Sequence, residues 1–226
     1  MIIIPSNTSA ALPPVSAPVT FVGSAIARAS TLTIPAHTAG DIICASAYIE
    51  TVDTPLSLGI PAGWTTTMAA NTAWTHYPFS VRWGGYRTAA GSGTSFGTFT
   101  NATHVGVHVF RPTGANGGFI KDWGTGAGYY GGFNGTGTDV PFTATTADPY
   151  AGAGTWGNSK IAYCVFADRG STISLRSGTT QSASSTWCKA VYASFTSSSL
   201  LLSSTLSPTC NWAAHYWQVW SNSPAA

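Results

Sequence analysis

One serine lies in a pattern that hydrolases use. The stretch Gly93-Thr94-Ser95-Phe96-Gly97 matches G-x-S-x-G, in which the serine is the nucleophile and sits on a sharp turn between a strand and a helix. Here the next residues, Thr98-Phe99-Thr100-Asn101, predict a strand followed by a turn and no helix. A chain so rich in glycine and serine produces such a match easily. We therefore expect Ser95 to be structural, and we assign no catalytic residue.

A second glycine pattern could bind a dinucleotide. The stretch Gly126-Ala127-Gly128-Tyr129-Tyr130-Gly131 matches G-x-G-x-x-G. That fingerprint requires a strand before it and a helix after it, and the sequence predicts neither. We therefore expect no cofactor.

Two histidines have a spacing that could hold a metal ion. His104 and His108 are four residues apart, which would place them on one face of a helix. The alternating Val105, Val107 and Val109 predict a strand instead. There the histidines share a face but stand about 13 Å apart at ~3.3 Å per residue, too far to bind one ion. We therefore predict no metal site. Carboxylates that are distant in the sequence could still form a glycosidase pair, but no spacing in the sequence indicates one.

The cysteines are widely separated and form no C-x-x-C motif. This argues against a zinc ribbon or a thioredoxin-type site. We expect buried free thiols that pack as small apolar groups. A Cys188–Cys210 disulfide is the alternative, since sequence alone does not give the pairing. The four positions are Cys44, Cys164, Cys188 and Cys210.

Eight of the nine tryptophans fall into two groups by context. Trp64, Trp83, Trp187, Trp217 and Trp220 lie in strand-like runs and are interpreted as core or sheet-face residues. The others of interest lie in loop-like stretches, where a large aromatic side chain suits a protein interface or a stacked sugar ring. The alternative is that each folds back over its own core. The aromatic interface candidates are Trp74, Trp123, Tyr129, Tyr130 and Trp156.

The elements that position these residues are predicted to be strands. Short β-rich runs broken by Gly, Pro, Asn and Ser are typical of a sandwich, and no segment has a helical period with capping signals. We predict an all-β fold, an antiparallel β-sandwich with a jelly roll as one variant, formed by residues 19–226 as a single domain. Residues 112–139, rich in glycine and aromatics, are predicted to be a loop. The predicted strands are Val19–Val22, Thr31–Ile34, Asp41–Ile49, Trp64–Met68, Phe79–Ala89, Ser95–Thr100, Thr103–Arg111, Lys160–Ala167, Thr186–Phe195, Leu200–Leu206 and Trp212–Ser221.

Residues 1–18 stand apart as an extended arm. Ile2, Ile3 and Ile4 precede a stretch with four prolines, and proline disfavours helix and keeps the preceding residue extended. A solitary domain has little reason to expose three isoleucines, so we interpret them as interface candidates. A disordered tail is the alternative.

The charge content excludes several classes of function. Only 7% of the 226 residues are Asp, Glu, Lys or Arg, against about 25% in ordinary soluble domains. The net charge of +2 is dispersed, whereas nucleic-acid binding needs a clustered basic stripe. No apolar run reaches the ~18 residues of a membrane span, and the first residues lack a secretory signal. We expect neither nucleic acid nor membrane as a partner. For export, we expect either that the protein is released when the cell lyses or that a secretory signal has been removed from this chain.

Certain stretches resemble a loose family of small β-rich proteins encoded among the structural genes of tailed bacteriophages. The likeness covers residues 21–112 and returns faintly at Trp217-Gln218-Val219-Trp220. It implies a virion component on the head or tail, and it transfers no catalytic residue. The stretches that carry it are Phe21-Val22-Gly23-Ser24-Ala25, Leu32-Thr33-Ile34-Pro35-Ala36-His37-Thr38-Ala39-Gly40-Asp41, Pro61-Ala62-Gly63-Trp64-Thr65, Tyr86-Arg87-Thr88-Ala89 and Gly97-Thr98-Phe99-Thr100-Asn101-Ala102-Thr103.

The expected function is therefore non-enzymatic. We expect a capsid decoration (cement) protein that packs against major capsid subunits and copies of itself, with a tail or baseplate accessory role as the nearest variant. The alternative from another class is a carbohydrate-binding or receptor-binding fibre module that uses the loop tryptophans. An enzyme such as a glycosidase or esterase is the third hypothesis.

Overall fold

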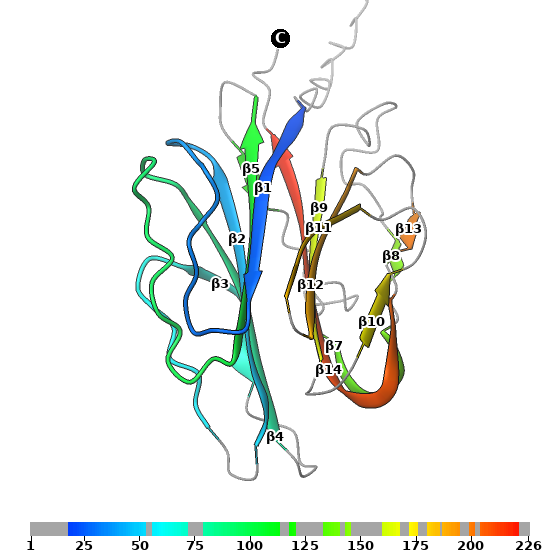
Figure 1. The fold of residues 1–226 in the computed structure, drawn as a ribbon. Coiled ribbons are helices and arrows are strands. Elements are labelled where there is room, and N and C mark those ends of the chain that lie inside the picture. The colour runs from blue at the N-terminus through cyan, green and yellow to red at the C-terminus, as the bar shows by residue number, and fades with distance from the viewer. Residues whose placement is uncertain are drawn as a thin grey trace, which may run out of the picture.

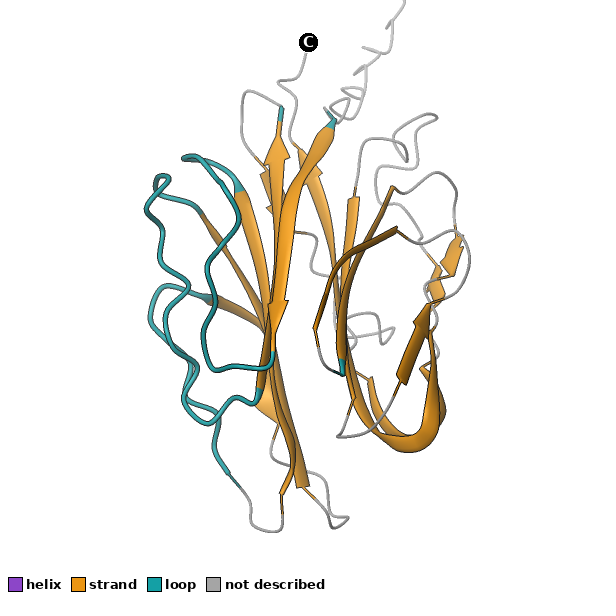
Figure 2. Ribbon diagram, in the orientation of Figure 1, coloured by secondary structure: helices purple, strands orange, loops and turns teal. Residues whose placement is uncertain are grey.

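The computed structural model describes most of the first half of the chain and separate stretches of the second half. The described residues are 18–52, 56–71, 79–113, 118–120, 133–140, 143–145, 160–167, 172–175, 180–185, 187–194, 199–201 and 204–221. They contain strands, loops and turns and no helix (Figure 2). The all-β prediction is confirmed.

The first sheet has five antiparallel strands in the order β1-β5-β2-β4-β3 (Figure 1). The central strand β2 is buried on both faces from position 42 to 49, which its two apolar faces predict. The bounds are β1 (Val19–Ala27), β2 (Ile42–Val52), β3 (Thr65–Asn71), β4 (Phe79–Thr88) and β5 (His104–Pro112).

The second sheet packs against the first and completes a β-sandwich (Figure 1). Its main order is β10-β14-β9-β12-β11, and two further strands, β6 and β7, also pair with β14. The bounds are β6 (Gly118–Ile120), β7 (Phe133–Val140), β9 (Lys160–Ala167), β10 (Thr172–Leu175), β11 (Thr180–Ser185), β12 (Cys188–Ser194) and β14 (Ser204–Ser221). A separate pair joins β8 (Thr143–Thr145) to β13 (Ser199–Leu201).

Two apolar layers hold the fold. The inner layer lies between the sheets, and the outer layer lies between the first sheet and the loops that cover its other face (Figure 2). Strand β2 serves both, because successive side chains of a strand point to opposite faces. The inner layer contains Val19, Ile26, Ile42, Cys44, Tyr48, Phe110, Ala162, Cys164, Phe166, Cys188, Ala190, Trp217 and Val219. The outer layer contains Ile34, Ile43, Ala45, Ala47, Ile49, Leu58, Trp83, Ala89, Phe96, Phe99, Val105, Val107 and Val109.

Two predicted strands are wrong. Residues 31–34 and 95–99 form loops, and Thr100 makes only an isolated bridge with Gly59. Their apolar side chains bury against the outer face of the first sheet, where Phe96 and Phe99 are 3% and 0% exposed. The apolar content of these segments therefore indicated burial correctly, but the segments do not pair as strands.

Part of the predicted loop at 112–139 is also paired. Strands β6 and β7 fall inside it, and β7 pairs with β14 over seven residue pairs, from Ser204↔Val140 to Ala214↔Phe133. The sequence of β7, Phe-Asn-Gly-Thr-Gly-Thr-Asp-Val, has no apolar alternation. Its pairing comes from backbone groups that meet a long neighbouring strand, which side-chain periodicity does not encode.

The boundary of the arm shifts by one residue. The Pro18 carbonyl accepts hydrogen bonds from the Thr113 backbone N–H at 3.1 Å and the Thr113 hydroxyl at 2.6 Å. Pro18 is therefore tied to the end of β5, and the part of the predicted arm that lies outside the described residues is 1–17.

Candidate functional site

Three buried histidines lie among the apolar side chains of the inner layer. His104 and His108 on β5 are both 0% exposed, and His215 on β14 is 1% exposed. Both β5 histidines lie on a strand, as predicted. Buried polar groups are costly unless hydrogen-bonded, so the partners of the two β5 histidines decide whether this layer is a reactive site or part of the scaffold.

His108 lies beside a thiol from the opposite sheet. Its Nδ1 is 3.8 Å from the Sγ of Cys164 on β9, and its ring stacks on Phe110. The backbone makes room for this thiol at Gly106, where an added Cβ would lie 2.8 Å from Sγ. A thiol beside an imidazole is the arrangement of cysteine nucleophiles, which require a lowered thiol pKa.

In this protein the thiol pKa values are raised instead of lowered. Burial raises the pKa of Cys164 to about 12 and that of Cys188 to about 12, and burial likewise holds the pKa of Cys44 well above its usual range. All three are free and buried, so the expected buried thiols are confirmed for these positions and the Cys188–Cys210 disulfide is wrong. A neutral thiol of this kind packs as an apolar group.

We expect these three thiols to resist alkylation in the folded protein. A pKa near 12 leaves roughly a thousandfold less thiolate than an ordinary cysteine at neutral pH, and the thiolate is the reactive form. Peptide mass spectrometry after iodoacetamide treatment should find Cys44, Cys164 and Cys188 unmodified in native protein and fully modified in guanidinium chloride. Rapid labelling of Cys164 in the native state would contradict the assignment; Cys210 is scored on its own peptide.

His104 belongs to a polar network at one end of the sandwich. Its Nδ1 lies 3.1 Å from the hydroxyl of Thr103, which also accepts the backbone N–H of Glu50 at 2.8 Å. Its Nε2 lies 3.7 Å from Glu50 Oε1, and the other carboxylate oxygen of Glu50 accepts a hydrogen bond from Arg28 at 3.2 Å. The network therefore joins β2 and β5 to the end of β1.

Arg28 extends this network to the second sheet. Its guanidinium lies over the ring of Trp187, 4.8 Å from the centroid. Trp187 sits in the turn between β11 and β12 with φ of 58°, which is uncommon for a bulky residue, and its carbonyl accepts the Ala167 N–H at 2.9 Å. The cation–π contact thus links the two sheets. Trp187 was expected in a strand and lies in a turn instead.

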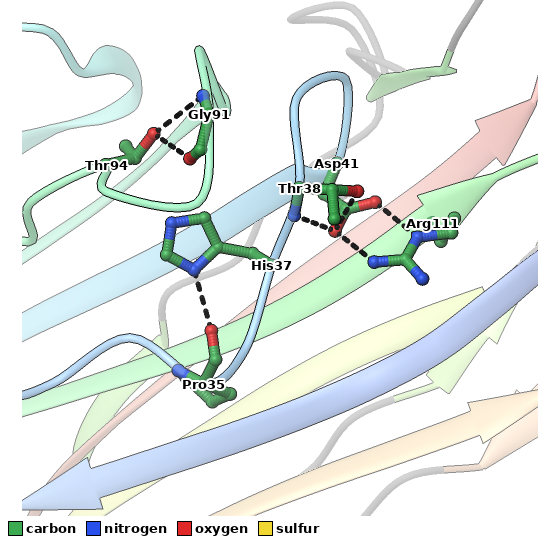
Figure 3. Close-up of polar contacts among 7 residues, drawn as sticks. All are labelled: Pro35, His37, Thr38, Asp41, Gly91, Thr94 and Arg111. Atoms are coloured by element: carbon green, nitrogen blue, oxygen red, sulfur yellow. Dashed lines mark hydrogen bonds and ion pairs between the residues drawn. The ribbon is translucent and has the colours of Figure 1, made fainter.

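A second charged site closes the other end of β2 (Figure 3). Arg111 on β5 donates two hydrogen bonds to Asp41, at 2.9 and 2.8 Å, and the Thr38 N–H donates a third at 2.8 Å. Asp41 is 1% exposed. Burial raises the pKa of its carboxyl, but the Arg111 and Thr38 hydrogen bonds and the Arg111 charge lower that pKa by more, and the net pKa lies below 3.8.

The Asp41 turn also anchors the neighbouring loops. The Gly40 N–H donates to the Ala89 carbonyl at 2.9 Å, and the Ala89 N–H donates to the Asp41 carbonyl at 2.8 Å. Ala89 follows β4, and the next turn is held by the Thr94 hydroxyl on the Gly91 carbonyl at 2.8 Å (Figure 3). Asp41 therefore holds together the loops that cover the outer face of the first sheet, and it is not an exposed acid.

The G-x-S-x-G stretch lies in the same set of loops over the outer face of the first sheet. The Ser95 hydroxyl accepts the Gly97 N–H at 3.2 Å, and the Ser95 carbonyl accepts a hydrogen bond from Arg87 at 2.8 Å. Residues 98–103, which the structure describes, form no helix after the motif. Arg87 in turn lies over the ring of Trp64. The motif therefore contacts Trp64 through Arg87.

We expect Ser95→Ala to change the free energy of unfolding by less than about 0.5 kcal/mol, since the exposed hydroxyl makes one local bond. Phe96→Ala next to it should cost about 3–5 kcal/mol, because Phe96 is buried in the outer layer. Urea unfolding of the two variants checks the contrast. Loss of an ester-hydrolysing activity in Ser95→Ala alone would instead make Ser95 a nucleophile.

The structure brings together residues that sequence reasoning had not linked. The pairs Asp41–Arg111 and Glu50–His104 come from segments far apart in the chain. One signal could have indicated them: with only 16 charged residues (nine Lys and Arg, seven Asp and Glu), each charge inside a strand needs a partner. The interface candidates all lie outside the described residues, so the structure does not place them; they are Ile2, Ile3, Ile4, Trp74, Trp123, Tyr129, Tyr130 and Trp156.

The other tryptophans are placed where their side chains are described. Trp83 and Trp217 are buried at 0% and 3% exposure, as expected. Trp64 is half-buried and packs edge-on against Trp83 and Phe96. Among the described residues, no three His, Cys, Asp or Glu side chains form a group that could hold a metal ion.

No helix in the described part of the chain is long and apolar enough to cross a membrane. Comparison with known proteins adds no family: no family model, no curated protein and no solved structure matches the chain.

Proposed function

We propose that this chain is a non-enzymatic structural protein of a tailed-bacteriophage particle and that it packs on the head as a decoration (cement) protein. One observation carries the proposal. The strands that end the two main sheet paths, β1, β3, β10 and β11, contain no Lys, Arg, Asp, Glu or Pro: their sequences are VTFVGSAIA, TTTMAAN, TISL and TQSASS.

Uncharged edges suit a protein that is permanently covered by neighbours. A protein that stays monomeric usually protects an exposed sheet edge with charges or proline, because its unpaired N–H and C=O groups pair readily with another chain. A protein that packs into a shell gains from the opposite choice, since few charges then lose their hydration at the contacts. Major capsid subunits and further copies of this chain are the proposed partners, and the virion is the proposed location.

The described polar groups support a scaffold role. The buried thiols are held neutral, and the buried carboxylate of Asp41 is bound by Arg111 and Thr38. Each of these groups stabilises a loop or a contact between elements. This supports assembly over catalysis as the purpose of the fold.

Copy number in the particle tests the proposal. Particles purified from a lysate that expresses this chain are digested, and its peptides are quantified against those of the major capsid subunit. A decoration protein is expected in hundreds of copies. A handful of copies would replace it with a fibre or tip role, where the glycan-binding alternative belongs, and absence from washed particles would overturn the virion role.

A further inference from the structure

Strand β1 offers an open edge that is held rigidly. Among the described residues it pairs with β5 alone, and it forms one end of the first sheet (Figure 1). Its middle is bound to the other sheet, since the Ser24 hydroxyl donates to the Ser182 hydroxyl on β11 at 2.7 Å. Inward, the Phe21 ring packs edge-on against Phe110 at 5.6 Å. A rigid edge binds an added strand without first losing its own conformational freedom.

The edge lacks the usual protection against strand addition. None of its nine residues is charged or proline, and its one irregularity is the register shift between Phe21 and Gly23. Thr20 is its exposed side chain. An uncharged edge of this length is a template for an extended segment that is equally uncharged.

The chain itself supplies such a segment immediately before β1 in the sequence. Residues 1–17 contain no charged side chain and include three consecutive isoleucines at positions 2–4, which favour strands. They lead directly into Pro18, whose carbonyl is held by Thr113 at the start of β1. Seventeen extended residues reach about 56 Å, compared with about 30 Å for the length of β1.

The sequence of this segment favours pairing with a second copy. Pro13, Pro14 and Pro18 favour an extended backbone in the residues before them, whereas pairing with β1 of the same chain would require a tight turn before β1. A second copy presents the same open edge beside the root of its own arm. Two copies can therefore exchange arms reciprocally, as a two-fold dimer requires.

We propose that β1 is the receptor strand for residues 2–12 of a second copy, which add to its open edge as a sixth strand. This deepens the proposed function, on which it rests only for the interpretation of the arm as a contact. The dimer can be tested without a virus particle, so its failure is distinguishable from failure of the virion role.

A complementation experiment tests the exchange. The full chain should have twice the mass of one chain by light scattering. Deleting residues 1–17 removes the arm, and Thr20→Glu blocks the edge with a charge while facing Arg111 across the β1–β5 pair. Each variant alone should be monomeric, and a mixture of the two should form a heterodimer, because one still has an arm and the other an open edge. Ser174→Glu, an exposed position on the edge strand β10, is the matched control and should stay dimeric.

Several outcomes would overturn the proposal. A monomeric full chain or a dimer that survives the deletion would each reject arm exchange, as would folded variants that do not associate on mixing. If Thr20→Glu dimerises like the full chain, the arm binds elsewhere. Monomers whose β1 amides are protected from hydrogen exchange only when the arm is present would show that the arm pairs with its own domain. Thermal unfolding confirms that each variant is folded.

Discussion

Asp41→Ala is expected to lower the free energy of unfolding by about 2–3 kcal/mol. The substitution removes a carboxylate that accepts two hydrogen bonds from Arg111 and one from the Thr38 N–H, and hydrogen bonds to a charged group are worth about 1.5–3 kcal/mol. Arg111 is 46% exposed, so water takes over its charge and the cost stays below that of stranding a buried ion. Urea unfolding at pH 7 measures the difference.

Asp41→Asn is the matched control because it keeps the size and one acceptor oxygen. The free energy of unfolding of Asp41→Asn should fall between those of the wild type and of Asp41→Ala. An alanine variant as stable as the wild type would show that the turn holds without the ion pair. Equal costs for asparagine and alanine would assign the whole effect to the charge.

The same carboxylate predicts a dependence on pH. Its folded pKa lies below 3.8 because hydrogen bonds and the charge of Arg111 outweigh the opposing effect of burial. A lowered folded pKa means that the stabilisation is complete above the unfolded pKa and is lost as pH falls through the folded one. Wild-type stability should therefore decline below about pH 4 more steeply than that of Asp41→Asn, which retains no proton-binding group there.

Deleting residues 1–17 is expected to abolish incorporation into particles and to leave the domain folded. The deletion spares the Pro18 carbonyl and its bonds to Thr113, and both apolar layers are built from residue 19 onward. Burying one isoleucine contributes about 1.5–3 kcal/mol, so three can supply several kcal/mol to an association, less the cost of ordering the arm.

The measurement compares full and truncated chains on particles that lack the protein. Recombinant chain is added, unbound chain is washed away, and the bound amount is quantified. The full chain should bind in hundreds of copies and the truncated chain at background. Replacing residues 2–4 with serine in the full-length chain is the control, and it should behave like the deletion. Unchanged binding of the truncated chain would show that the arm has no role in assembly.

The sequence by itself determined the class of the fold and the character of its best-patterned strands. Two apolar faces in the run from Ile42 to Ile49 indicated a central strand, and alternating valines identified β5 and put His104 and His108 on one face. These patterns succeed because the alternation of a strand is local and shows how much of each face is buried. The scarcity of charge also comes from sequence alone, whereas the sheet topology was needed to show that the edge strands, which carry the proposed role, are uncharged.

Only the tertiary structure decided which segments pair as strands and which lie as loops over the first sheet. Residues 31–34 and 95–99 have strand-like composition but lie as loops over the first sheet, whereas the glycine-rich β7 pairs with β14. It also joined Asp41 to Arg111 across 70 positions and opened space at Gly106 for Cys164. Such contacts depend on backbone partners and on volumes contributed by distant segments. No local period of apolar residues contains that information, because register and packing are set only when the two sheets meet.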